Sequence, residues 1–177
     1  MKNTRLKYIK RFAIIAAVVG IIIVITGCSS TTSTDQSTGA SAPVQTQQSG
    51  VALWVSAGGP QRIQGYLGQA AEALGRVGDD ATSLNSSAVL NDGNEVLSAA
   101  TSMRAEAALC GDPALAAIIS STAGHLENIG NATKSAGFAI DSGDISAINS
   151  ATETLKINNQ SLIQDRLDLE NWVANNV

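Results

Sequence analysis

The tripeptide Gly111-Asp112-Pro113 interrupts a chain whose apolar residues otherwise recur at helical spacing. Glycine ends a helix readily because it adopts the left-handed conformation, an aspartate side chain caps the next helix, and proline suits the first helical position. So short a connection makes the two helices that it joins antiparallel neighbours. The dipeptide Gly143-Asp144 repeats the pattern and predicts a second tight turn between helices.

The segments around these turns carry apolar seams at alternating steps of four and three residues, the period of helices that pack lengthwise. The first seam, for example, runs Ile63, Leu67, Ala70, Leu74, Val77, Ala81 and Leu84. We therefore predict an all-α fold, with a first helix over about 60–85, a second that ends at Gly111, a third that begins at Pro113 and a fourth that follows the cap Asp144. Four helices joined by short turns form an antiparallel up-down four-helix bundle most naturally.

The sequence leaves two possible starts for the second helix, because Asn91-Asp92-Gly93-Asn94 favours a turn on local propensity. The helix begins either at a cap at Ser86 or Ser87, or only at about Asn94. Cys110 falls on its apolar seam and is predicted to be a buried, unreactive thiol. A reactive thiol, the alternative, needs a positive and partly exposed setting.

The polar residues of the fourth seam and the segment 51–55 each have two interpretations. Asn159 and Arg166 are polar residues on the fourth seam, where they either set the helix register or lie at the seam's edge; we favour the edge. Residues 51–55 form a helical turn or an extended lead-in, and Trp54 within them is expected to cover one end of the bundle. The alternative for Trp54 is a contact with a membrane or a partner.

The first 27 residues have the organisation of a secretory leader. Residues 1–12 are basic and residues 13–26 are an apolar run, shorter than the roughly twenty residues that a spanning helix needs. Ile25-Thr26-Gly27-Cys28 resembles the lipobox of bacterial lipoproteins. The resemblance implies cleavage between Gly27 and Cys28 and a diacylglyceryl group on the Cys28 thiol. An uncleaved membrane anchor and ordinary secretion are the alternatives.

Residues 28–50 comprise the lipidated cysteine and a Ser/Thr-rich tether that is predicted to be disordered, followed by the helical domain at 51–177. After cleavage six basic residues remain against fifteen acidic ones, a net charge of about −9. This balance gives no basis for nucleic-acid binding, which needs clustered Lys and Arg. The expected location is the extracytoplasmic face of the cell membrane, held there by the lipid on Cys28.

The residues for catalysis or metal binding are sparse. His125 is the single histidine, no Glu stands three residues before it, and its expected place is at the surface or an edge. A zinc site needs three or four ligands and a nucleophile needs a neighbouring base, and no such pattern occurs in the sequence. We expect no metal, no cofactor and no enzymatic activity.

One further likeness concerns the helical part. Trp54 with Gly58-Gly59-Pro60, then Asp112-Pro113 and Gly143-Asp144, are similar to residues of small, Ala-rich secreted or lipid-anchored proteins of actinobacteria and their phages. The resemblance implies a source and a helical fold, but no site. Some of those proteins carry a cysteine pair, and with Cys28 acylated only Cys110 remains here.

The leading interpretation is a membrane-anchored lipoprotein that serves as a non-enzymatic interaction or structural module, with an envelope protein as its partner. The alternative is a binding protein for a small apolar ligand held between helices, because Ala- and Gly-rich seams can leave a groove.

Overall fold

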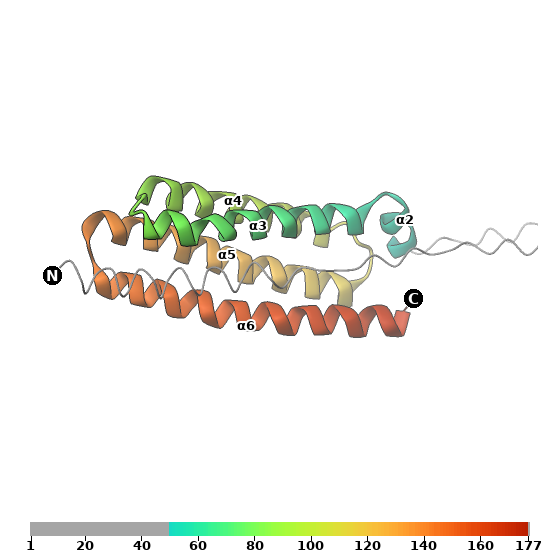
Figure 1. Ribbon diagram of the computed structural model, residues 1–177. Helices are drawn as coiled ribbons and strands as arrows, with labels where there is room; N and C mark the ends of the chain where they lie inside the picture. The colour runs from blue at the N-terminus through green and yellow to red at the C-terminus, as the bar shows by residue number, and fades with distance from the viewer. Residues whose placement is uncertain (1–49, 177) are drawn as a thin grey trace, which may run out of the picture.

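The computed structural model describes residues 50–176, which form five α-helices packed as a bundle (Figure 1). No strand occurs among these residues, so the predicted all-helical fold is confirmed. The predicted leader 1–27, the cleavage site Gly27–Cys28 and all but the last residue of the tether lie outside the described residues. The helices are α2 (Gly50–Ser56), α3 (Gly59–Thr82), α4 (Ser86–Ala107), α5 (Pro113–Ser142) and α6 (Ile145–Asn176).

The short helix α2 closes one end of the bundle. Trp54 is buried, and its ring lies against the backbone of Gly59, where a Cβ would come within 2.0 Å of an indole carbon. Only glycine fits at that position. Gly58 makes the preceding turn with φ of 79°. The prediction that Trp54 covers an end of the bundle is confirmed.

The predicted turns are present. The Asp112 carboxylate accepts a 2.7 Å hydrogen bond from the Leu115 amide and so caps α5. Gly143 ends α5 in the left-handed conformation with φ of 71°. The Asp144 side chain then accepts from the Ala147 amide at 3.0 Å, at the start of α6.

The stretch 91–94 lies inside α4, so the alternative that the helix begins only at about Asn94 is wrong. The cap is Asn85, which accepts from the Ala88 amide, and not Ser86 or Ser87 as expected. Tertiary packing overrides the local turn propensity, because Gly93 lies close against the backbone of α5. A Cβ on Gly93 would be 2.9 Å from the Gly130 carbonyl oxygen.

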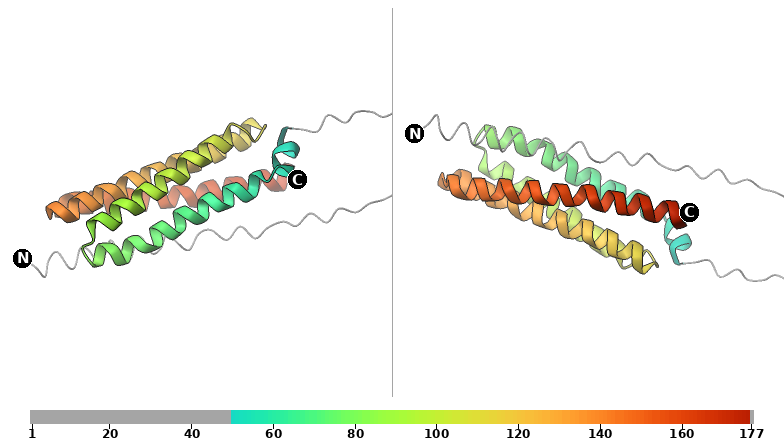
Figure 2. Two further views of the ribbon diagram at one scale, coloured as in Figure 1. Left: turned by 90° about the horizontal axis from the view of Figure 1, so that it is seen from above. Right: turned by 90° about the horizontal axis from the view of Figure 1, so that it is seen from below.

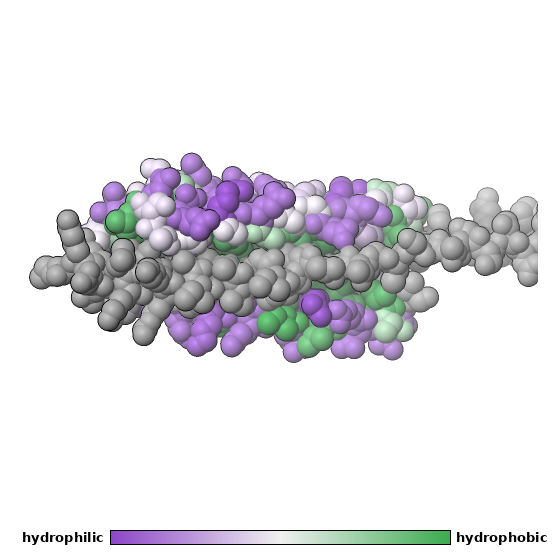
Figure 3. All heavy atoms as spheres, in the orientation of Figure 1, coloured by the Kyte–Doolittle hydropathy of each residue, from purple (hydrophilic) through white to green (hydrophobic). Residues whose placement is uncertain are grey.

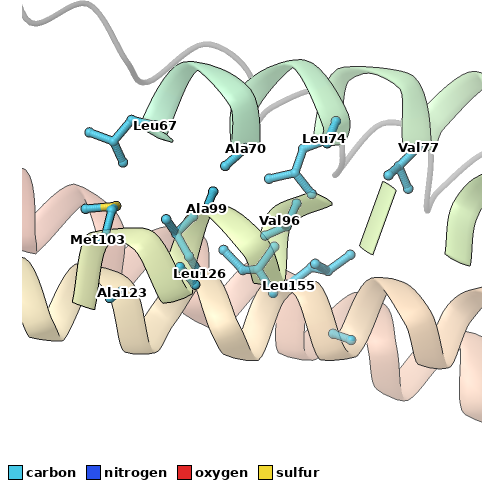
Figure 4. Packing of buried hydrophobic residues seen from close by; sticks show 14 of the residues in the cluster. Leu67, Ala70, Leu74, Val77, Val96, Ala99, Met103, Ala123, Leu126 and Leu155 are labelled. Carbon is cyan, nitrogen blue, oxygen red and sulfur yellow. The ribbon is translucent and has the colours of Figure 1, made fainter. Parts of the chain in front are cut away.

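Four of the largest fully buried side chains come from four different helices: Leu74, Met103, Leu126 and Leu155. Figure 4 shows side chains of α3 pointing toward those of α4 and α5. Cys110 is 0% exposed at the edge of this core, which confirms that its thiol is buried. Burial of aliphatic side chains stabilises such a bundle by roughly 1.5–3 kcal/mol for each large residue.

The bundle is open on one side. Helices that follow one another in the chain pack together, from α3 through α4 and α5 to α6, but no Cα of α3 lies within 8 Å of a Cα of α6. Seen from below, α6 lies in front, with α3 on one side of it and α5 on the other (Figure 2, right). A closed four-helix bundle would bring the first and last helices into contact.

Candidate functional site

The open side of the bundle carries an apolar groove between α3 and α6. Its walls are formed by α3 and α6 and its floor by α5, with Met103 of α4 beneath. The aliphatic lining includes Leu67 and Leu74 of α3, Leu126 of α5, and Leu162 and Leu169 of α6. The space enclosed between these side chains has a volume of ≈ 70 Å³. We call this feature the α3–α6 groove.

One buried amide lines the α3–α6 groove without a hydrogen-bond partner for its oxygen. Asn159 is 8% exposed, and its Oδ1 atom is fully buried and accepts no hydrogen bond. An unpaired buried acceptor costs about 1–3 kcal/mol. Asn159 is therefore not at an exposed edge of the seam, and the favoured interpretation is wrong for it. Arg166 lies at the exposed rim, as that interpretation expects.

Apolar side chains continue from the α3–α6 groove onto the exposed surface of α6. Ile163 and Leu167 follow Asn159 at steps of four residues, so the three lie along one ridge of the helix. Ile163 is 41% exposed and Leu167 is 42% exposed. Figure 3 shows hydrophobic surface over the middle of α6, bordered by hydrophilic residues.

A polar cluster joins α5 to α6 beside the α3–α6 groove. The Ser121 hydroxyl donates to Asp165 Oδ1 at 2.8 Å, and His125 Nδ1 lies 3.1 Å from Asn158 Oδ1. His125 Nε2 is 3.8 Å from Asp165 Oδ2, an ion pair only when the imidazole is protonated. His125 is thus a partly exposed residue at the interface of α5 and α6, whereas the prediction placed it at the surface or an edge. Ser121 is bonded to a carboxylate and not to an imidazole, so the cluster is no nucleophile–base pair.

A second polar cluster fastens α2 and α3 to α4. Glu106 is 5% exposed and accepts hydrogen bonds from Arg62 and from the Trp54 indole. The hydrogen bonds from Arg62 hold the pKa of Glu106 below its ordinary value, against the opposing effect of burial. This cluster joins the helices α2, α3 and α4.

Asp92 is the other buried carboxylate of α4. The Arg76 Nε atom donates a 2.9 Å hydrogen bond to Asp92 Oδ1, whereas the buried Oδ2 atom of Asp92 has no hydrogen-bond partner. Burial raises the pKa of Asp92 above its ordinary value, because the loss of hydration outweighs the hydrogen bonds from Arg76. Neither buried carboxylate belongs to a metal site: residues 50–176 contain no group of three or more His, Cys, Asp or Glu side chains placed to hold a metal ion.

The predicted site residues Gly27 and Cys28 lie outside the described residues, so the lipidation site stays a prediction. Within residues 50–176, no helix is both long and apolar enough to cross a membrane. Comparisons with protein families, with curated proteins and with solved structures give no match to this chain. The likeness to small actinobacterial and phage lipoproteins likewise stays a prediction.

The Ala- and Gly-rich seams suggested a groove between helices as the alternative, but they placed no groove between α3 and α6 and did not indicate the unpaired amide. A periodic seam shows which face of each helix is buried, but not whether two helices far apart in the chain meet. The signal that was present is the polar residue Asn159 between Leu155 and Leu162 on the fourth seam.

Proposed function

We propose that this chain is a lipoprotein anchored by Cys28 to the extracytoplasmic face of the cell membrane, where it acts as a non-enzymatic interaction or structural module of the envelope. The surface that binds a partner is the α3–α6 groove. We also infer that the four long helices have antiparallel up-down topology with α2 as a separate cap. The short turns at Asp112 and Gly143 and the order of colours along the helices in Figure 1 support this topology.

The observation that carries the proposal is the unpartnered apolar side of the bundle. α6 has 32 residues but packs only against α5, while its groove-side ridge exposes Ile163 and Leu167. Adjacent exposed apolar residues that border a groove are typical of interaction surfaces. A partner helix in the α3–α6 groove would cover the leucines of both walls, as an added helix does in other helix-in-groove complexes.

The alternative function, storage of a small apolar ligand, is favoured by the position of the groove beside Met103 and Leu126. Its size argues against that function. Pockets for small molecules usually enclose about 300–1,000 Å³, whereas this one encloses ≈ 70 Å³. That space suits the insertion of one or two side chains from a partner better than it suits a whole ligand.

Site-specific crosslinking in intact membranes tests the proposed surface. A photoreactive amino acid at Leu162, which lines the α3–α6 groove, should crosslink to a protein partner that mass spectrometry then identifies. The same group at Ile157, an exposed residue of α6 that does not line the groove, is the matched control. Equal crosslinking at both positions would contradict the assignment of the groove, and an apolar small molecule attached at Leu162 would favour the alternative.

The intact mass of the protein extracted from membranes tests the anchor. The expected mass is that of residues 28–177 with a diacylglyceryl group, and Cys28→Ala should abolish both the lipid and the cleavage. A mass that still includes residues 1–27 in the wild-type protein would contradict the lipoprotein assignment and indicate an uncleaved anchor.

A further inference from the structure

We propose that the partner of this surface is a second copy of the same chain, with the two α6 helices antiparallel across a two-fold axis at Ile163. The inference rests on the proposed function, since it names a partner for the exposed ridge of α6 that lies beside the α3–α6 groove. In such an isologous pair each copy presents the same patch to the other. The helix α6 of one copy then covers the exposed ridge of α6 in the other, beside the α3–α6 groove.

The first argument is the position of the exposed apolar residues. Residues spaced by four form one ridge of a helix, and here the ridge carries Asn159, Ile163 and Leu167. With Ile163 on the axis, each Ile163 contacts its counterpart. Asn159 faces Leu167 of the second copy, because the two residues are equally distant from the axis. The pairing therefore covers the two large exposed apolar residues of this ridge, Ile163 and Leu167.

The second argument is charge complementarity around the same axis. Lys156 lies seven residues before Ile163 and Glu170 lies seven residues after it, which puts all three on one face at the coiled-coil repeat. Both charged side chains are exposed, at 54% and 57%. Antiparallel pairing about Ile163 sets Lys156 opposite Glu170 of the second copy, and does so twice. Parallel pairing would instead set like charges side by side.

The third argument is the unpaired oxygen of Asn159. In this register Arg166 of the second copy comes next to Asn159, one residue away from the directly facing position. Arg166 is exposed at the rim and uses its Nε for Glu170 of its own helix, at 3.0 Å. A guanidinium group has five N–H donors, so it keeps donors for Asn159 Oδ1, which is buried in the single chain and meets them when the Asn159 side chain turns toward the second copy. The second copy thus supplies a donor for an acceptor that the single chain leaves without one.

Disulfide trapping of the full chain in membranes tests the pairing. Ile163→Cys puts a thiol next to its own symmetry mate, and mild oxidation should give a covalent dimer on a non-reducing gel. Ile157→Cys is the matched control, since Ile157 is an exposed isoleucine of the same helix on a different face. It should stay monomeric. The native Cys110 is buried, so the wild-type chain gives the background.

Charge reversal distinguishes this register from other ways of pairing. In the Ile163→Cys background, Lys156→Glu sets Glu opposite Glu and Glu170→Lys sets Lys opposite Lys, so each variant alone should lose the covalent dimer. When the two variants carry different tags and are expressed together, opposite charges face each other at both sites. The mixed dimer should then form, and the double variant should also regain its dimer.

Each outcome decides between the possibilities. The proposed pairing would be overturned if Ile163→Cys and Ile157→Cys gave equal amounts of dimer, or if the charge reversals did not change the amount of dimer. Loss of the dimer together with photo-crosslinks from Leu162 to a different protein would overturn the second copy as partner, yet support the proposed function. If neither a dimer nor a crosslink is found, both the proposed pairing and the proposed function are overturned. Circular dichroism of each variant shows whether the helices are intact.

Discussion

The indole nitrogen of Trp54 donates a 2.9 Å hydrogen bond to the carboxylate of Glu106, which lies 52 residues later in the chain. The same carboxylate is held by Arg62 of α3. One buried acidic side chain of α4 therefore joins the cap helix α2 and the start of α3 to the central pair of helices.

Glu106→Gln is expected to lower the free energy of unfolding by about 1.5–3 kcal/mol, because it weakens buried hydrogen bonds with a charged partner. Glu127→Gln is the matched control. It removes the charge of the exposed pair between Glu127 and Arg104, which is worth less than about 1 kcal/mol. Urea denaturation followed by circular dichroism measures both. Equal losses would mean that the contacts of Glu106 do not stabilise the bundle.

The pH dependence of stability should report the two buried carboxylates of α4, Glu106 and Asp92, with opposite signs. The pKa of Glu106 is lowered by folding, so its contribution is present above the ordinary carboxyl value of 4.5 and is lost as the pH falls through the lower folded value. The pKa of Asp92 is raised, so the folded state takes up this proton first. Its contribution to stability therefore increases as the pH falls.

The measurement is urea denaturation at pH steps from neutral into the acid range. The difference in free energy of unfolding between the wild type and Glu106→Gln should be largest above the ordinary carboxyl value and should shrink in acid. The difference between the wild type and Asp92→Asn should change in the opposite direction. A pH-independent difference for either variant would contradict the assigned shift.

Two glycine substitutions should have opposite effects. Gly93→Ala puts a Cβ within 2.9 Å of the Gly130 carbonyl oxygen, where backbone must move. Such overpacking costs about 1–3 kcal/mol. Gly65→Ala in α3 meets nothing within 4 Å and should stabilise the helix by roughly 0.5–1 kcal/mol. Thermal unfolding should show a lower Tm for the first variant and a higher Tm for the second, and a rise for both would refute the close approach of α4 and α5.

The Cys110 thiol should react with labelling reagents only after the protein unfolds. It is 0% exposed and lies 3.4 Å from the carbonyl oxygens of Ala107 and Asp112. Its labelling rate should therefore rise with urea in step with loss of helical signal. Rapid labelling in the absence of urea would indicate that the turn at Gly111 opens in the folded protein.

The sequence was sufficient for features that depend on local chemistry. Features with a short-range cause were predicted correctly. They are the capping aspartates Asp112 and Asp144, the helix end at Gly143, and the apolar seam from Ile63 to Ala81. They lie where the sequence placed them. The fate of Cys110 also followed from the seam, because a residue in phase with buried neighbours is itself buried.

Features that depend on contacts between distant segments were missed. The residues 91–94 look like a turn, but in α4 the lack of a side chain at Gly93 permits the approach of Gly130, and Asp92 is held by Arg76 of another helix. The apolar seams of α3 and α6 do not show that these two helices stay apart. Asn159 was interpreted as an edge residue, because the sequence alone does not distinguish a rim from a buried wall.

The cap at the start of the bundle also determines how the domain would respond to a pull. The chain enters at Gly50, where an added Cβ would lie 3.0 Å from the Gly111 backbone, at the turn between α4 and α5. Tension on the preceding segment therefore passes through Trp54 into α4. The first long-range contact to bear such a pull is the 2.9 Å hydrogen bond between Trp54 and Glu106.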